Sequence, residues 1–188
     1  MATRIVVAIS GASGSIYGIR LLEVLQELGI ETHVVASPAG MVTLRQETSL
    51  GMADLESRSD VVYRAADIGA AIASGSFRTD GMVVVPCSVR TMSEIASGIT
   101  SSLVSRAADV TLKERRPLVL CVRETPLHAG HLDTMTRLAN MGAFIAPPVP
   151  AFYTRPETLD DIINHTVGRL LDHLGIDNKL VERWSGTT

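Results

Sequence analysis

The sequence of 188 residues has no long hydrophobic run, few aromatic side chains, two cysteines and little net charge. No apolar stretch approaches the roughly 20 residues that cross a bilayer as a helix, so we expect no membrane-spanning segment. Aromatic residues make up 4% of the chain, too few for a platform that stacks single-stranded nucleic acid. A net charge of −3 likewise indicates no basic surface for nucleic acid or anionic membranes.

Cys87 and Cys121 lack the spacing of a metal site or of a CxxC redox pair. Each lies in or beside an apolar stretch, so we expect two small buried residues. His128 and His131 are three residues apart, but no HExxH motif or third ligand accompanies them, and we predict no metal site. Isolated thiols, and N-terminal residues that enter a strand without the apolar region of a secretory signal, predict a cytoplasmic location.

Short apolar stretches alternate with helical patterns along the whole chain. Strands are predicted at residues 4–10, 31–36, 82–86, 117–122 and 143–146. Helices are predicted at residues 15–28, 39–48, 65–73, 91–97, 102–115, 128–141 and 158–174, with a polar loop at 51–60. Because the strands are continuously apolar, they indicate one α/β domain over residues 1–188, with a parallel sheet covered by helices on both faces.

The loops after the strands carry the candidate site, because parallel sheets bind ligands beyond the carboxyl ends of their strands. Residues 11–15 (Gly-Ala-Ser-Gly-Ser) open a helix, and their small side chains would let an anion reach its free N–H groups; a tight turn without a ligand is the alternative. The second strand ends at Ala36 and Ser37, where a classical NAD site has a carboxylate. This difference and the missing GxGxxG motif disfavour a dehydrogenase and favour a ligand such as FMN.

The third strand is followed by Ser88, Arg90 and Thr91, which could hold a flavin or simply begin a helix. After the fourth strand, Arg123 could bind a phosphate, and Glu124 could transfer a proton if burial raised its pKa. An internal ion pair between these two residues is the alternative.

Several segments resemble one known family, the UbiX/phenolic-acid-decarboxylase-subunit-B flavin prenyltransferases. The similar segments are Gly11–Gly14, Pro86–Ser88, Arg106–Leu120, Arg123–His128 and Pro147–Tyr153, and the resemblance extends to about Trp184. It implies a flavodoxin-like or Rossmann-like fold, trimers assembled into a dodecamer, and no metal. Members of the family join the dimethylallyl group of dimethylallyl monophosphate to N5 and C6 of reduced FMN. The prenylated FMN then serves UbiD-type decarboxylases.

The resemblance also implies roles for individual residues. The expected FMN contacts are Gly11, Ala12, Ser13, Ser37, Ser88, Val89, Arg90, Thr91 and Arg123. The expected ligands of the prenyl phosphate are Tyr153 and Arg169, with Lys113 and Arg106 beside them. The expected catalytic residues are Glu124, Glu47, Ser13 and Trp184.

These assignments suit the chemistry of an allylic transfer. The leaving phosphate needs cations and hydroxyl groups, whereas the allyl cation is stabilised by aromatic faces such as Trp184. Lys113 and Arg169 are distant in sequence, so the fold or a neighbouring subunit must bring them together. A solvated basic helix face is the alternative for Arg106 and Lys113. For the whole chain, the alternatives are an FMN-dependent decarboxylase of a small carboxylic acid and a non-catalytic FMN carrier.

Overall fold

A six-stranded parallel sheet forms the centre of the protein. The structure is a computed structural model that describes residues 3–181, 183, 184 and 186. The strands, in chain order, are β1 (Arg4–Ile9), β2 (Glu31–Ala36), β3 (Val61–Arg64), β4 (Gly81–Cys87), β5 (Leu118–Val122) and β6 (Phe144–Ile145). Their order in the sheet is β3-β2-β1-β4-β5-β6, and every neighbouring pair is parallel. The strand order reverses between β1 and β4, which is where open sheets of this kind bind ligands.

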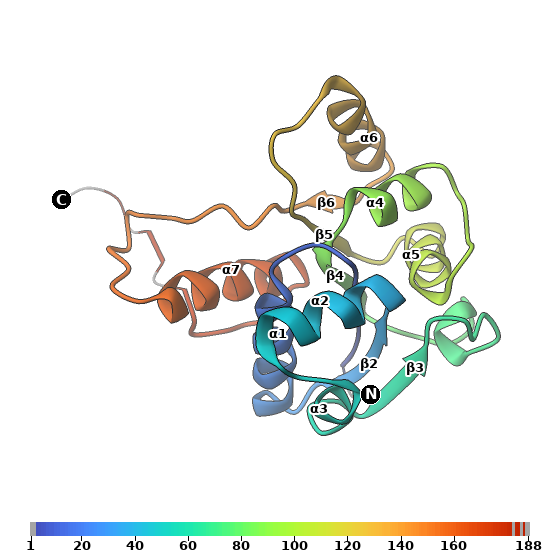
Figure 1. Ribbon diagram of the computed structural model, residues 1–188, viewed down its shortest axis with the longest axis horizontal. Coiled ribbons are helices and arrows are strands. Elements are labelled where there is room, and N and C mark those ends of the chain that lie inside the picture. The colour runs from blue at the N-terminus through green and yellow to red at the C-terminus, as the bar shows by residue number, and fades with distance from the viewer. Residues whose placement is uncertain (1–2, 182, 185, 187–188) are drawn as a thin grey trace.

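Helices cover both faces of the sheet, as the apolar strands predicted (Figure 1). They are α1 (Ser15–Glu27), α2 (Pro38–Thr48), α3 (Met52–Glu56), α4 (Val89–Ala96), α5 (Leu103–Lys113), α6 (Ala129–Asn140) and α7 (Leu159–His173), with a 3₁₀ turn, η1 (Ala71–Ala73). Side chains of β1 alternate between the two layers. Ile5, Val7 and Ile9 pack in the cluster that includes α1 and α7, whereas Val6 and Ala8 pack in the cluster that includes α4 and α5.

Two predicted segments differ from the structure. Residues 65–73 do not form a helix, because only η1 is helical there, and the backbone carbonyl of Ala65 accepts a hydrogen bond from Leu103 at the start of α5, 2.8 Å away. Asp67 and Gly69 also have low helix propensity. Residues 51–60 are not a featureless loop, because they contain α3 and lead directly into β3, an edge strand that the sequence patterns did not reveal.

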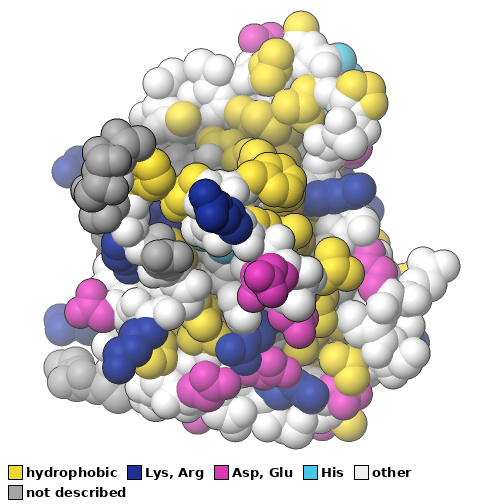
Figure 2. All heavy atoms as spheres, turned by 90° about the vertical axis from the view of Figure 1, so that its left-hand side faces the viewer, with side chains coloured by type: hydrophobic (Ala, Val, Ile, Leu, Met, Phe, Trp, Pro, Cys, Tyr) yellow, Lys and Arg dark blue, Asp and Glu magenta, His cyan; other side chains and the backbone are white. Residues whose placement is uncertain are grey.

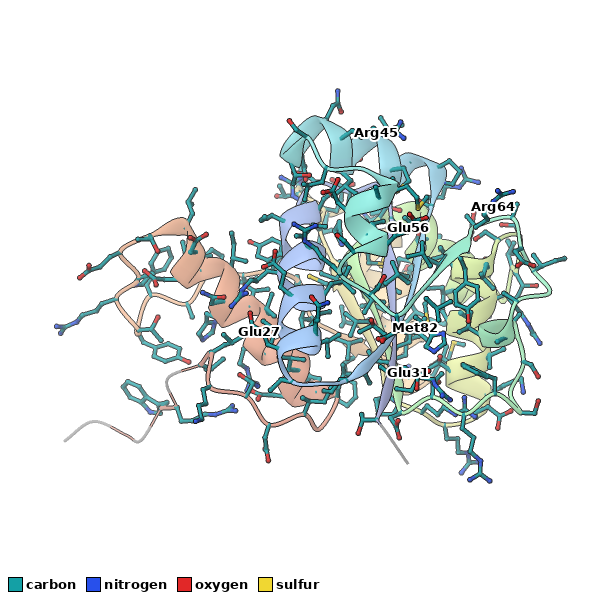
Figure 3. All side chains as sticks on the ribbon, turned by 90° about the horizontal axis from the view of Figure 1, so that it is seen from below. Glu27, Glu31, Arg45, Glu56, Arg64 and Met82 are labelled. Carbon is teal, nitrogen blue, oxygen red and sulfur yellow. The ribbon has the colours of Figure 1, made fainter. Side chains whose placement is uncertain are left out.

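Helix α6 and the segment from β6 to α7 extend from the body of the protein (Figure 1). Within α6, Leu138 is the one buried residue. Figure 2 shows hydrophobic side chains gathered on the upper part of this face, and the exposed apolar residues of these elements include Leu132, Val149 and Phe152. After α7, residues 174–181 turn back beneath this helix (Figure 3). Within the described part of the chain, no helix combines the length and the apolar character needed to cross a bilayer.

Candidate functional site

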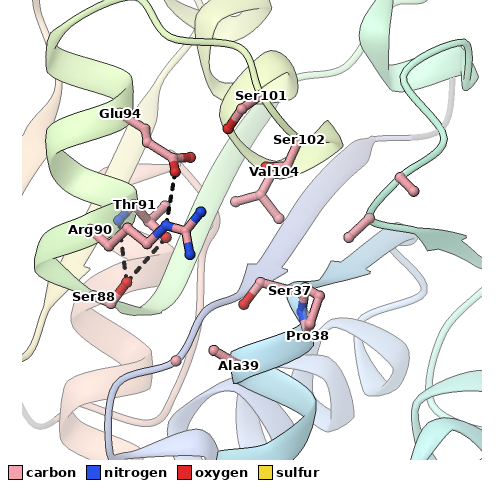
Figure 4. Close-up of a pocket in the computed structure, with 13 residues that line it drawn as sticks. Ser37, Pro38, Ala39, Ser88, Arg90, Thr91, Glu94, Ser101, Ser102 and Val104 are labelled. Carbon is pink, nitrogen blue, oxygen red and sulfur yellow. Dashed lines mark hydrogen bonds and ion pairs between the residues drawn. The ribbon is translucent and has the colours of Figure 1, made fainter.

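A cavity of about 360 Å³ opens where the loops after β1, β2 and β4 meet (Figure 4). Five of the predicted FMN contacts line it: Gly11, Ser37, Ser88, Arg90 and Thr91. The other lining residues are Pro38, Ala39, Ala65, Ala66, Glu94, Ser101, Ser102 and Val104. The cavity therefore occupies the point where the strand order reverses, as the parallel sheet predicts.

Three helices begin at the wall of this cavity, each with a serine at its N-terminal cap. Ser37 accepts a hydrogen bond from the N–H of Gly40 at 3.0 Å, Ser88 from Thr91 at 3.3 Å, and Ser102 from Ser105 at 3.4 Å. These caps begin α2, α4 and α5. The positive ends of three helix dipoles and several hydroxyl groups are thus directed at one small volume, which suits a phosphate group.

The loops after β1 and β4 are tied together by Ser10, a residue that the sequence patterns did not single out. Its side chain is fully buried, donates to the carbonyl of Pro86 at 2.9 Å and accepts from the N–H of Ser88 at 2.8 Å. A polar residue at the end of an otherwise apolar strand was the signal that could have revealed it. Ser10 fixes the position of Ser88, which lines the cavity.

Glycine 11 allows the loop after β1 to approach α2 closely. A Cβ atom at Gly11 would lie 2.5 Å from the Cβ of Ala39, so no other residue fits without a shift of the backbone. Across the cavity, Arg90 pairs with Glu94 at 3.0 Å, and the Arg90 side chain is 85% exposed (Figure 4). Its guanidinium can therefore turn toward a ligand at little cost.

The N-terminus of α1 does not line the cavity, because a carboxylate of the protein itself binds there. Glu47 accepts hydrogen bonds from the N–H groups of Gly14 at 3.0 Å and Ser15 at 2.9 Å. Desolvation alone would raise the pKa of Glu47, but bonds from the Ser13 hydroxyl and these two N–H groups hold it below its ordinary value. Glu47 is thus an ionised partner of α1, and Ala12 and Ser13 lie in the loop that it stabilises.

The predicted pair Arg123 and Glu124 follows β5 at the same edge of the sheet. Both residues are exposed and neither lines the cavity. The backbone N–H of Arg123 donates to the carbonyl of Cys87 at 3.1 Å, which anchors this loop beside the start of α4. Glu124 accepts a hydrogen bond from the N–H of Thr125 at 3.0 Å rather than pairing with Arg123.

A second group of predicted residues gathers beside α7. The Tyr153 hydroxyl lies 3.1 Å from Nε2 of His165, and the Tyr153 ring meets the Trp184 ring edge to face with centroids 5.6 Å apart. Arg169 lies one helical turn after His165 and helps to line a cavity of about 240 Å³. Burial and the charge of Arg169 lower the pKa of His165, which favours its neutral form. The sequence reasoning missed His165, whose spacing of four residues from Arg169 was the available signal.

Lys113 and Arg106 do not join this group within one chain. Lys113 pairs with Glu114 and lies against Gly75, in the loop that leads to the start of β4. Along the axis of α5, Lys113 lies roughly 15 Å from Leu103, toward the edge of the sheet opposite the cavity. Arg106 pairs with Asp109 at 2.7 Å and donates to the carbonyl of Ala73 at 3.1 Å. Within one chain, the fold therefore does not bring these two cations beside Tyr153 and Arg169, and of the two routes that the sequence left open, a neighbouring subunit remains.

Both cysteines are buried, as expected. Burial raises the pKa of Cys121 to about 12 and raises that of Cys87 as well, so neither thiol is a ready nucleophile. Among the residues that the structure describes, no group of three or more His, Cys, Asp or Glu side chains could hold a metal ion.

The chain is similar to known flavoproteins both in sequence and in fold. Residues 1–171 match the family model described as Flavoprotein. The chain is 56% identical over 186 residues to the flavin prenyltransferase UbiX of Escherichia coli strain K12, covering 97% of this chain and 98% of that protein. It superimposes on the crystal structure of AnUbiX (PadA1) in complex with FMN and dimethylallyl pyrophosphate with a TM-score of 0.97, at 46% identity over the full length of both chains. A dodecameric FMN-dependent UbiX-like decarboxylase from Escherichia coli O157:H7 gives a TM-score of 0.95 at 45% identity, covering 98% of this chain and all of that one.

Proposed function

The chain belongs to the flavoprotein family, among the UbiX flavin prenyltransferases, and on this premise we propose that it prenylates reduced FMN. It joins the dimethylallyl group of dimethylallyl monophosphate to N5 and C6 of the flavin and releases phosphate. One observation carries the proposal: over nearly its whole length the chain is similar to proteins named flavin prenyltransferases. The cavity of about 360 Å³ where the strand order reverses supports it. The protein acts as one domain spanning residues 1–188.

The FMN phosphate is the part of the substrate that best suits the cavity between α2, α4 and α5. Ser37, Ser88 and Thr91 supply hydroxyl groups there, and Gly11 leaves room for the ligand. Arg90 can leave Glu94 to add a positive charge. We place Ala12, Ser13, Val89 and Arg123, which belong to the adjoining loops, along the rest of the flavin.

The prenyl donor suits the group beside α7. Arg169 and Tyr153 would bind its phosphate, and Trp184 would offer an aromatic face to the allyl group as the carbon–oxygen bond breaks. A monophosphate carries less charge than a diphosphate, so side-chain cations can stabilise it without a metal ion. Glu124, exposed in the loop after β5, is our candidate to accept the proton that leaves C6. Glu47, held ionised at the N-terminus of α1, would position Ser13 and the flavin loop rather than donate a proton.

Lys113 and Arg106 can serve the donor only from another copy of the chain. One of the solved relatives is a dodecamer, and we propose that this protein likewise forms a homo-oligomer built from trimers. Lys113 at the far end of α5 would then reach a neighbour's site. The product would pass to a UbiD-type decarboxylase, and the cytoplasmic location stays a prediction from the sequence.

Mixing two inactive variants tests the shared site. Lys113→Ala and Arg169→Ala each remove one cation, but a mixed oligomer contains some sites with both. If subunits assort at random, about a quarter of the sites recover, because each site takes one residue from each of two chains. Recovered activity after reassembly supports a shared site, whereas none would place Lys113 outside the reaction.

The activity itself is tested in one anaerobic reaction. The protein is mixed with reduced FMN and dimethylallyl monophosphate without added metal, and the flavin is analysed by mass spectrometry. A flavin heavier by one dimethylallyl group supports the proposal. A protein that binds FMN but leaves it unmodified with both the monophosphate and the diphosphate is not a prenyltransferase. Carbon dioxide release from a small carboxylic acid would then indicate a decarboxylase, and no turnover at all an FMN carrier.

A further inference from the structure

The carboxylate of Asp172, near the C-terminal end of α7, is shared by two arginines. Arg169 donates to it from Nη1 at 2.5 Å, and Arg183 donates from Nη1 at 2.6 Å and from Nη2 at 2.7 Å. The Asn178 side chain adds a fourth hydrogen bond at 3.1 Å. The Asp172 side chain is 15% exposed, and the bond from Arg183 is the main cause that holds the pKa of Asp172 below its ordinary value.

The described residues just before Arg183 pack against α7. A Cβ atom at Gly168 would lie 2.4 Å from Cγ2 of Val181, which shows how closely the returning segment approaches the helix backbone. The Asn178 side chain donates to the carbonyl of Gly168 at 3.1 Å, and its Oδ1 accepts from the N–H of Leu180 at 3.2 Å. Val181 is buried. Figure 3 shows the segment running back beneath α7.

This docking brings three parts of the chain to one place. Trp184 follows Arg183 directly, and its ring contacts Tyr153, from the segment before α7. The guanidinium groups of Arg169 and Arg183 carry two positive charges against the single negative charge of Asp172, so this group of three has a net charge of +1. Each guanidinium has five N–H donors, and Asp172 engages only part of them. Donors thus remain free for a second anion.

We propose that Asp172 is a positioning residue that holds Arg169 and Arg183 as a pair of ligands for the phosphate of the prenyl donor. The inference rests on the proposed function and adds Arg183 and Asp172 to its site. By the same contacts, Asp172 keeps Asn178 and Arg183, and with them Trp184, docked on α7. Without its negative charge the two guanidinium groups repel each other, and the segment loses its main polar attachment.

The test replaces Asp172 by Asn, which keeps the shape and removes the charge. Without Asp172 the two guanidinium groups move apart, and we expect the phosphate to lose one charge-assisted contact with them. That loss predicts a rise of about tenfold in KM for dimethylallyl monophosphate. The affinity for FMN should stay unchanged, because Asp172 does not line the cavity between α2, α4 and α5. Asp172→Glu should recover part of the donor affinity. Asp160→Asn, an exposed change in the first turn of the same helix, is the matched control.

Trp184 gives a second readout that does not depend on turnover. It is the only tryptophan in the sequence, so the fluorescence anisotropy of the flavin-free protein reports on the C-terminal segment alone. We expect faster motion of Trp184 in Asp172→Asn and not in Asp160→Asn. Arg183→Gln should raise KM for the donor while leaving FMN affinity unchanged, and combined with Asp172→Asn it should cost less than the two changes added together.

Three results would overturn the inference. An unchanged donor KM in Asp172→Asn and Arg183→Gln would remove both residues from donor binding. Unchanged motion of Trp184 would show that Asp172 does not hold the segment, and an equal loss of FMN and donor affinity would indicate general damage to the fold. Failure of the proposed function looks different, because the unaltered protein would then leave FMN unmodified.

Discussion

Replacing Glu47 tests the finding that a carboxylate of the protein binds the N-terminus of α1. Its two oxygens accept hydrogen bonds from Gly14, and Oε2 also accepts one from Ser15 at 2.9 Å. Gly14 is the N-cap residue of α1, with a φ of 107°, and as a glycine it has no side chain that could cap the helix. Glu47, reaching from α2, therefore does the work that a serine cap does at the other helices.

The size of the effect follows from these contacts. Glu47→Ala removes charge-assisted hydrogen bonds to two backbone N–H groups and a favourable charge at the helix dipole. Because Glu47 is exposed, water replaces part of these hydrogen bonds in the variant. We therefore expect a loss of about 1–2 kcal/mol in the free energy of unfolding. For a chain of this size each kcal/mol lowers Tm by about 2–4 °C. Glu47→Gln keeps an acceptor and should cost less.

The loss should depend on pH in a defined direction. The folded protein lowers the pKa of Glu47 below its ordinary value of 4.5, so folding favours the ionised form. The stabilisation is therefore fully present above that ordinary value and disappears as the pH falls through the lower folded pKa. The difference between the unaltered protein and Glu47→Ala should be constant at neutral pH and shrink in acid.

Urea unfolding of the flavin-free protein, at one protein concentration and several pH values, measures both effects. Glu56→Gln is the control, because Glu56 is an exposed carboxylate at the end of α3 (Figure 3) whose side chain makes no hydrogen bond within the described residues. A Glu47→Ala protein as stable as this control, or a loss independent of pH down to strongly acidic conditions, would refute the reasoning.

Three further changes have defined outcomes. Glu31→Gln weakens a two-point ion pair with Arg4 (2.7 and 2.8 Å) and should lower the free energy of unfolding in urea by about 1–3 kcal/mol at pH 7. Because the pKa of Glu31 is lowered from 4.5 to about 2, this loss should fade as the pH drops through that range, and a loss that persists below it contradicts the ion pair. Gly40→Ala places a Cβ 2.5 Å from the carbonyl oxygen of Ile9, so it should lower the free energy of unfolding by about 1–3 kcal/mol and weaken FMN binding in a titration. Unchanged stability and FMN affinity would show that the backbone shifts at no cost. Glu124→Gln should still bind FMN but slow formation of the prenylated product in the mass-spectrometric assay, and full activity would remove Glu124 from the mechanism.

The regular elements could be predicted because burial imposes its pattern on the sequence. Strands such as β4 and β5 are buried along their whole length, and the same residues are continuously apolar. The edge strand β3 could not be found in this way, because its residues are only partly buried and carry no such pattern. The stretch 65–73 gave the opposite error: its alanines favour a helix, but Asp67, Gly69 and the hydrogen bond between Ala65 and the start of α5 outweigh them.

The site could be predicted only where it follows from topology. The rule that parallel sheets bind ligands at their carboxyl edge selected Gly11, Ser37 and Ser88, and these three residues line the cavity. It could not select Ser101 or Ser102, because these residues precede a helix rather than follow a strand, and they reach the cavity through the packing of α5. The roles assigned by resemblance remain predictions until the variants are measured.

The position of Lys113 shows that one chain alone cannot place all the predicted donor ligands at one site. A helix that begins at the ligand edge and runs antiparallel to the strands must end at the opposite edge, so a residue at its C-terminus cannot return to its own site. Lys113 lies there, against the loop before β4, while Arg169 belongs to α7, which packs on the opposite face of the sheet from α5. Lys113 and Arg169 can be ligands of one phosphate only if they come from two copies of the chain. The exposed apolar surface around α6 and Phe152 offers a contact for a second copy, which could bring its own α5 to the donor. The oligomer would then be part of the active site rather than a means of stabilising the fold.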